Sequence, residues 1–165
     1  MIINFVGTLQ APVYVLNPPL DTKWIQHGMS DSCGEANNNK TILTVGRLVE
    51  RKGHDAVIRS LPAIIAEVPN VRYQIIGDGP ERVRLEGLVE SLNLRDSVEF
   101  LGRVADSELA KYYEGCALFI MPSRESLSDI EGFGIVYLEA GAFGKPVIGG
   151  RSGGIADAII DGETG

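Results

Sequence analysis

The sequence predicts an α/β fold in which helices cover both faces of a mainly parallel sheet, forming a three-layer sandwich. From about residue 40, short β-branched runs alternate with longer segments of helical spacing. The short runs are almost continuously apolar, as in strands that are buried on both faces. The 165 residues also include 20 glycines, well above the usual share of about 7%. Glycine is needed where a backbone turns sharply or approaches a ligand closely.

The alternation defines five strands and four main helices. We expect strands at 41–46, 71–77, 98–102, 117–121 and 146–150. We expect helices at 54–68, 81–93, 106–115 and 134–144, and a last helix that begins near Gly154. Asp106, followed by Glu108 and Leu109, is typical of a capped helix start. Strictly alternating elements of this kind predict a Rossmann-like domain, whose ligands bind at the carboxyl ends of the strands.

The domain is expected to occupy residues 40–165, preceded at 1–39 by a hinge or linker remnant. Residues 30–40, SDSCGEANNNK, are polar and rich in Ser, Asn and Gly, as linkers are. The sequence ends in DGETG, which is typical of a turn after which a sheet continues. We therefore expect a domain that is truncated at its C-terminus.

Charge and cysteine content narrow the classes of partner. The net charge is −7 and the pI about 4.8, so no overall basic field attracts nucleic acid, and any membrane contact is peripheral. Cys33 and Cys116 lie in unlike surroundings and lack the spacing of metal ligands, which favours a reducing, cytoplasmic setting. The apolar first residues lack the basic region of a signal peptide and are too short for a membrane span.

The first loop at a strand end, GRLVERKGH, predicts a phosphate site. Gly46 ends the strand, and Arg47, Arg51 and Lys52 come just before a helix that begins near His54. Arginine offers a planar fork of donors, lysine a mobile charge, and a helix N-terminus adds N–H groups. A solvated basic turn is the alternative for the same residues.

The second loop, IIGDGP, contains two glycines that suit either a flat ligand or a tight turn. Gly77 and Gly79 flank Asp78, and an acidic residue in this place binds the ribose of NAD in dinucleotide folds. However, Gly46 is followed by a long basic loop and not by the GxGxxG fingerprint. An NAD oxidoreductase is therefore disfavoured.

The third region, MPSRESLSDIEGFGIVYLEAGAFGKPVI, holds two glutamates around a helix start. Glu131 precedes the helix, and Gly132 and Gly134 leave its first N–H groups accessible to an anion. Glu139 lies in the apolar stretch VYLEAGAF. It is either a solvated residue, or a partner of Lys145, or a partly buried carboxylate, which needs hydrogen-bond partners.

Taken in order, these motifs resemble the nucleotide-binding domain of the GT-B retaining glycosyltransferases of the family 4 type (glycosyl transferases group 1), which include sucrose synthase and bacterial mannosyltransferases. The matching pieces are VGRLVERKGHDAVIRSLP, IIGDGP, VEFLGRV and EGFGIVYLEAGAFGKPVI, followed by GGIADAIIDGETG. Each piece alone is weak, whereas the ordered set is specific. The loop at 124–130 is longer than is usual in the family.

The resemblance implies a role for each matching residue. Arg47 and Lys52 would bind the donor diphosphate and stabilise it as it leaves, and Glu131 would hold hydroxyls of the transferred sugar. These three residues form the implied catalytic set. Backbone N–H groups of Phe133, Gly134 and Ile135 would lie near the sugar and phosphate of the donor. Glu139 would bind its ribose, and Arg103 and Val104 would frame its base. Gly46, Gly77 and Asp78 complete the implied donor site.

The resemblance also implies partners and limits. The substrate would be a nucleoside diphosphate sugar, and EGFGIVYLEA is similar to mannosyltransferases that use GDP-mannose. No metal or cofactor is expected. The acceptor, a glycan or a lipid-linked group in polysaccharide biosynthesis, would bind an N-terminal domain that is absent here, so we expect binding without efficient turnover. A UDP-sugar 2-epimerase-like domain and a non-catalytic nucleotide sensor are the alternatives.

Overall fold

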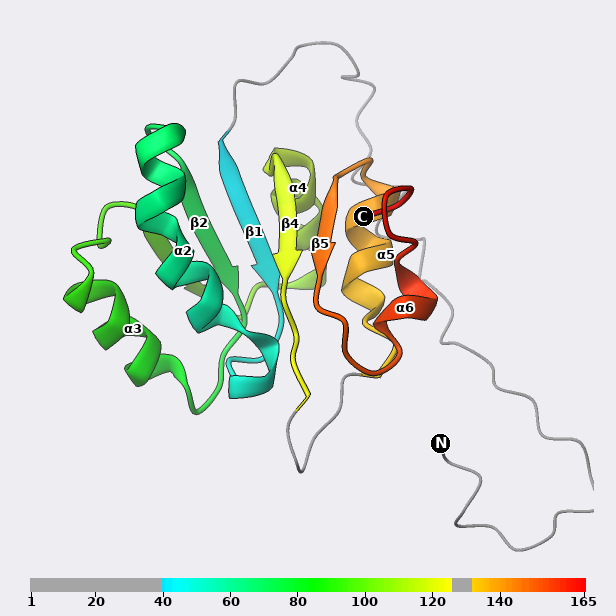
Figure 1. The fold of residues 1–165 in the computed structure, drawn as a ribbon, viewed down its shortest axis with the longest axis horizontal. Helices are drawn as coiled ribbons and strands as arrows, with labels where there is room; N and C mark the ends of the chain where they lie inside the picture. The colour runs from blue at the N-terminus through cyan, green and yellow to red at the C-terminus, as the bar shows by residue number, and fades with distance from the viewer. Residues whose placement is uncertain (1–39, 126–131) are drawn as a thin grey trace, which may run out of the picture.

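The computed structural model of this chain describes residues 40–125 and 132–165, and Figure 1 shows their fold. Five strands form one sheet in the order β3-β2-β1-β4-β5, and every neighbouring pair is parallel. The strands are β1 (Thr41–Val45), β2 (Arg72–Ile76), β3 (Val98–Gly102), β4 (Leu118–Met121) and β5 (Val147–Gly149). The predicted parallel sheet is confirmed, with strand ends that differ by no more than one residue.

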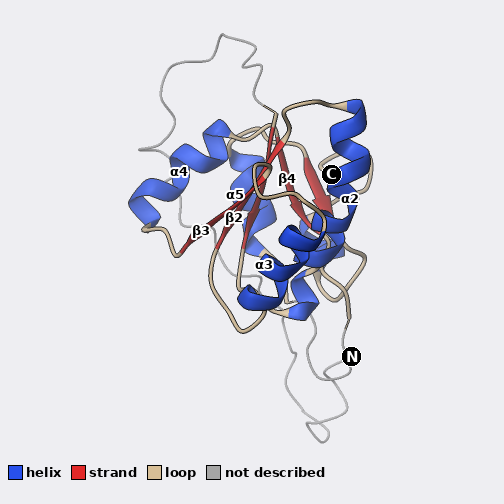
Figure 2. Cartoon of the chain, turned by 90° about the vertical axis from the view of Figure 1, so that its left-hand side faces the viewer, coloured by secondary structure: helices blue, strands red, loops and turns tan. Residues whose placement is uncertain are grey.

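Helices cover both faces of the sheet and so form the predicted three layers. They are α2 (His54–Glu67), α3 (Arg82–Ser91), α4 (Asp106–Gly115), α5 (Ile135–Ala142) and the short α6 (Ile155–Ala158), with a 3₁₀ turn η2 (Glu50–Lys52) before α2. Figure 2 places α2 and α3 on one side of the strands and α4 and α5 on the other.

The inner strands β1 and β2 contribute to the cores on both faces of the sheet, because consecutive side chains point to opposite sides of it. Ile42 packs into the core beneath α2 and α3, whereas its neighbour Leu43 packs into the core beneath α4 and α5. In β2, Ile75 likewise packs beneath α2 and α3, and Ile76 packs beneath α4 and α5. This explains why the strands are apolar at successive positions and not at alternate ones.

The strand order reverses beside β1. The chain runs outward from β1 through β2 to β3 and then returns to place β4 on the other side of β1. The loops that follow β1 and β4 therefore leave the sheet in opposite directions, and such a point is where open α/β sheets bind ligands. Hydrogen bonds join the loop after β1 to the loops after β2 and β4. Leu48 N–H donates to Asp78 O, in the loop after β2, at 3.0 Å, and Arg124 N–H, in the loop after β4, donates to Arg51 O at 2.8 Å. The described parts of the three predicted loops thus share one edge.

The start of α4 differs from the sequence expectation. The N-cap is Ala105, in extended backbone, and no side chain caps this helix, so the predicted capping role of the Asp106 region is wrong. Asp106 and Glu108 lie instead inside the first turn. Their charges there face the positive end of the helix dipole, which explains the acidic start without a capping hydrogen bond.

Candidate functional site

Lys52 lies where β1 and β4 end, at the point where the strand order reverses. A methyl group at Gly46 would lie 3.8 Å from Lys52 Cε and 3.4 Å from Met121 Sδ, so the lysine side chain passes over the glycine. Lys52 is half-buried and Arg47 is exposed. The first loop therefore brings two cationic side chains to the end of β1, as an anion site requires.

The backbone of this first loop is held by buried contacts. Gly53 has a φ of 72°, and a Cβ there would lie 2.3 Å from Pro122 O, so only glycine fits. His54, which is 1% exposed, hydrogen-bonds through Nε2 to Arg47 O at 3.1 Å. Burial is the main cause that lowers the pKa of His54, and its imidazole is therefore neutral at pH 7. Sequence reasoning saw His54 only as a helix start.

The glycines of the second loop are required by contacts between backbones. A Cβ at Gly77 would lie 2.0 Å from Gly46 O, and one at Gly79 would lie 2.4 Å from Leu48 O. Asp78 closes the turn, since its Oδ1 accepts a hydrogen bond from Gly79 N–H at 2.8 Å. Of the two interpretations of IIGDGP, the structure shows the tight turn, packed against the first loop. A contact of Asp78 with ligand stays a prediction.

Helix α5 begins at this same edge of the sheet. Gly134, its N-cap, has a φ of 75°, and a Cβ there would lie 2.5 Å from the Tyr137 ring. The Tyr137 hydroxyl donates to Met121 O at 2.6 Å and so fixes α5 against the end of β4. The first N–H groups of a helix have no acceptor within it, which makes this start suited to a phosphate. Phe133 and Ile135 flank Gly134, whereas Glu131 lies outside the described residues.

Glu139 is a half-buried carboxylate on α5. Tyr113 on α4 donates its hydroxyl hydrogen to Glu139 Oε2 at 2.7 Å. Lys145, the sequence-based candidate partner, donates instead to Glu114 O at 2.8 Å. Burial is the main cause that raises the pKa of Glu139, the Tyr113 hydrogen bond opposes this effect, and the charge of Asp106 adds to it. The prediction of a partly buried glutamate with a partner is confirmed, but sequence reasoning missed Tyr113.

Replacing Glu139 with glutamine should stabilise the unliganded chain at neutral pH. Because the folded-state pKa of Glu139 is raised, folding disfavours its charged form, and wild-type stability falls as the pH rises through that pKa. Glutamine carries no charge and can still accept from Tyr113. Thermal melting should show a higher Tm for Glu139→Gln at pH 7.5 and no difference at about pH 3, well below the pKa of about 4.3 of an unfolded glutamate. A gain of equal size at both pH values would contradict this origin.

The residues expected near the base follow β3 at the same edge. Gly102 has a φ of 70° and turns the chain out of the strand. Arg103 is exposed, whereas Val104 is half-buried and packs against the core beneath α4 and α5. Arg103 and Lys52 are thus separated by β2, which places the predicted base contacts beyond the predicted phosphate contacts along one sheet edge.

Arg124 is a further basic residue at this edge to which sequence reasoning gave no role. Its Nη2 donates to Asp55 Oδ1 at 3.0 Å, in the first turn of α2, and lies 3.8 Å from Glu50 Oε1. Arg124 therefore ties the segment after β4 to the phosphate loop. The rest of the long loop, 126–131, lies outside the described residues.

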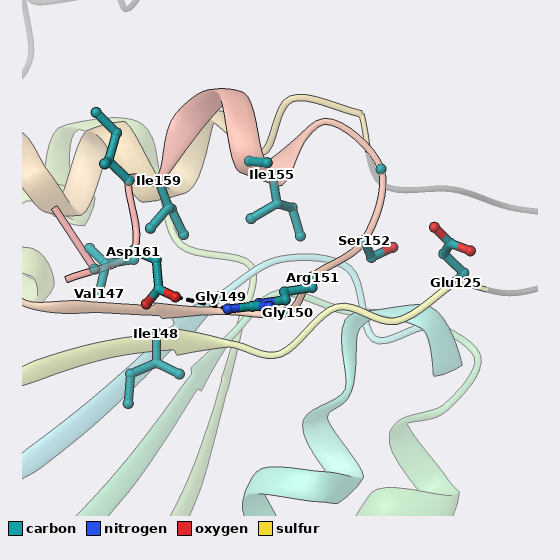
Figure 3. A pocket seen from close by; sticks show the side chains of 14 residues that line it. Glu125, Val147, Ile148, Gly149, Gly150, Arg151, Ser152, Ile155, Ile159 and Asp161 are labelled. Atoms are coloured by element: carbon teal, nitrogen blue, oxygen red, sulfur yellow. Dashed lines mark hydrogen bonds and ion pairs between the residues drawn. The ribbon is translucent and has the colours of Figure 1, made fainter. Parts of the chain in front are cut away.

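A groove of about 790 Å³ runs beside β5 and α6 (Figure 3). Ser152 and Glu125 lie near one end of it, and Asp161, which pairs with Arg151 at 2.9 Å, lies near the other. Ser152 Oγ is buried and has no hydrogen-bond partner among the described residues. Arg47, Lys52 and Glu139 are not among the described residues that line this groove.

Two kinds of feature are absent from residues 40–125 and 132–165. No group of three or more His, Cys, Asp or Glu side chains there is arranged to hold a metal ion. No helix in the same part of the chain is long and apolar enough to cross a membrane.

Comparisons with known proteins agree with the fold. A GDP-mannose-dependent α-(1-6)-phosphatidylinositol monomannoside mannosyltransferase of Mycolicibacterium smegmatis is 40% identical over 126 residues, which are 75% of this chain and 33% of the relative. A phosphatidylinositol N-acetylglucosaminyltransferase subunit of Arabidopsis thaliana is 33% identical over 155 residues, 94% of this chain and 33% of that protein. The chain thus spans about a third of the length of these curated relatives.

Solved structures show the same arrangement. The sucrose-phosphate synthase of Thermosynechococcus elongatus is 31% identical, with a TM-score of 0.64 over 86% of this chain and 34% of that one. Anabaena HepE, in complex with UDP and glucose, is 30% identical, with a TM-score of 0.63 over 76% of this chain and 33% of that one. The family model described as glycosyl transferases group 1 matches residues 29–165. This chain therefore belongs to the glycosyl transferases group 1 family.

Proposed function

We propose that this chain binds the sugar donor of a retaining glycosyltransferase, which transfers a sugar from a nucleoside diphosphate to an acceptor. The main support for this function is the arrangement of residues at the point where the strand order reverses. Lys52 passes over Gly46 at the end of β1, and Tyr137 fixes the start of α5 to the end of β4. The first loop and the start of α5 thus lie at the ends of neighbouring strands, which supports a diphosphate site between cationic side chains and a helix N-terminus.

Arg47 and Lys52 bind the diphosphate in this proposal and stabilise the charge that develops on it as the glycosidic bond breaks. The N–H groups of the 133–135 segment contact the phosphate and sugar, and Glu131 accepts hydrogen bonds from sugar hydroxyls. Two positive side chains and a helix terminus supply this stabilisation without a metal ion. The proposed reaction accordingly needs no cofactor.

Nucleoside recognition is assigned to Glu139 and to the segment after β3. A carboxylate accepts hydrogen bonds from both hydroxyls of a ribose, and Glu139 is held at the second turn of α5 by Tyr113. Arg103 and Val104 frame the base. We favour guanine and mannose, because the curated relatives that are 37 to 40% identical include several named GDP-mannose-dependent mannosyltransferases.

The acceptor is assigned to a part of the enzyme that this chain does not include. The two curated relatives described above carry phosphatidylinositol or a derivative of it in their names, which supports a lipid-linked acceptor over a soluble glycan. The proposed location is the cytoplasm, with peripheral contact at the inner face of the membrane.

Isothermal titration calorimetry of the chain with GDP-mannose, GDP, UDP and NAD tests this function. GDP-mannose should bind roughly tenfold more tightly than GDP, because hydroxyl contacts to the sugar each contribute about 1 kcal/mol. GDP should bind more tightly than UDP, and EDTA should change neither affinity. A site that prefers bare GDP to GDP-mannose would instead indicate a nucleotide sensor, and binding of NAD alone would overturn the proposal.

A further inference from the structure

Tyr113 is the buried side chain that connects α4 to α5. It is 0% exposed and lies in the core beneath these two helices. Its ring stacks on Phe143, with centroids 5.6 Å apart and planes within 8° of parallel. It also packs against Phe119 of β4 at 5.9 Å. The ring is therefore fixed from two sides by aromatic contacts.

The ring and the hydroxyl of Tyr113 contact two residues of the same segment. Phe143 caps the C-terminal end of α5 and comes four residues after Glu139, so the two side chains lie one above the other on one helix face. Tyr113 stacks on the first and donates a hydrogen bond of 2.7 Å to Oε2 of the second. Because the ring cannot shift without disturbing the stack, the position of the hydroxyl is set by packing.

This contact fixes one oxygen of Glu139 and leaves the other for a ligand. Tyr113 is the hydrogen-bond donor to this carboxylate within the described part of the chain. Burial and the charge of Glu139 raise the pKa of Tyr113 well above its ordinary value, so the hydroxyl stays protonated and donates at neutral pH. A glutamate without such a contact keeps its rotamer freedom, and binding must then remove that freedom at an entropic cost.

We propose that Tyr113 is a positioning residue for ribose recognition, which holds Glu139 in the rotamer that accepts hydrogen bonds from the ribose hydroxyls of the donor. This inference rests on the proposed function, since it requires that a nucleotide binds beside Glu139. Tyr113 itself does not contact the ligand. Its effect should therefore be seen only with nucleotides that carry ribose hydroxyls.

The test compares Tyr113→Phe with wild type in binding to GDP and to 2′,3′-dideoxy-GDP. Phenylalanine keeps the ring and its stack on Phe143 and removes only the hydroxyl. GDP affinity should fall roughly five- to tenfold, because binding must then restrict a Glu139 side chain that Tyr113 no longer holds. Affinity for the dideoxy nucleotide should be nearly unchanged. Tyr112→Phe, which removes a hydroxyl from the neighbouring and partly exposed tyrosine of α4, is the matched control and should match wild type for both nucleotides.

A double-mutant cycle completes the test. In a Glu139→Ala background, Tyr113→Phe should cost much less GDP affinity than in wild type, because alanine has already removed the carboxylate that Tyr113 positions. Equal losses for GDP and the dideoxy nucleotide, or no loss for either, would overturn the positioning role while wild-type binding still supports the proposed function. Failure of the wild-type chain to bind either nucleotide would overturn the proposed function itself.

Discussion

Replacing Arg47 or Lys52 with alanine is expected to weaken GDP binding by about 1.5 to 3 kcal/mol each, the range for hydrogen bonds to charged groups, or roughly ten- to hundredfold. The expectation follows from the place of Lys52, whose side chain passes over Gly46 at the end of β1. The loss at Arg47 should shrink as salt is added, because Arg47 is exposed and salt screens exposed charges, and the loss at the half-buried Lys52 should shrink less. Calorimetry at two salt concentrations measures both effects.

Matched controls exist at the opposite edge of the sheet. Arg72 begins β2 and is exposed, and Lys40 immediately precedes β1, where its Nζ donates to Pro69 O at 3.0 Å. Alanine at either position removes the same charge far from the strand-end loops, and GDP affinity should not change. If Arg47→Ala and Lys52→Ala also bind GDP as wild type does, the first loop is only a solvated basic turn.

Glu131→Ala and Glu139→Ala should change the affinities for GDP-mannose and GDP in different ways. Glu131→Ala should weaken GDP-mannose binding by about 1 to 3 kcal/mol, the cost of an unpaired hydroxyl in a closed site, yet leave GDP nearly unaffected. Glu139→Ala should weaken both ligands by a similar amount, because both carry the ribose. Calorimetry with the two ligands separates these patterns.

A melting experiment must accompany the Glu139 variant, because this side chain is half-buried and bonded to Tyr113. Glu139→Gln is the better-tolerated companion, since glutamine keeps the shape and an acceptor oxygen. Similar losses of GDP affinity in the Glu131 and Glu139 variants would contradict the proposed separation of sugar and ribose contacts.

The elements of this fold could be predicted because local pattern and tertiary environment agree. β3 and α4 begin and end at the predicted residues, because an apolar run bounded by turn residues favours a strand and a three- and four-residue apolar spacing favours a helix. The common edge of the strand-end loops followed from the parallel sheet alone. The same reasoning placed Lys52 and the start of α5 at that edge.

The partners of individual side chains could not be predicted, because they depend on how each helix is rotated against its neighbours. Tyr113 and Glu139 are 26 residues apart, and only the packing of α4 against α5 brings them together. The burial of His54 and the contact of Arg124 with Asp55 have the same origin. A hydrogen-bond partner for Tyr113 could have been expected from the sequence, since a tyrosine at a buried helix position needs a partner for its hydroxyl.

The most direct test of the central claim is to locate bound GDP by NMR on the isotope-labelled chain. We expect amide signals to shift in residues 46–53, 103–104 and 134–139, which form the predicted donor site, and to stay in place in residues 155–161. Most of residues 155–161 line the groove beside β5, and this segment serves as an internal reference. Shifts confined to the groove, with the loop after β1 and the start of α5 unchanged, would contradict a donor site between β1 and β4.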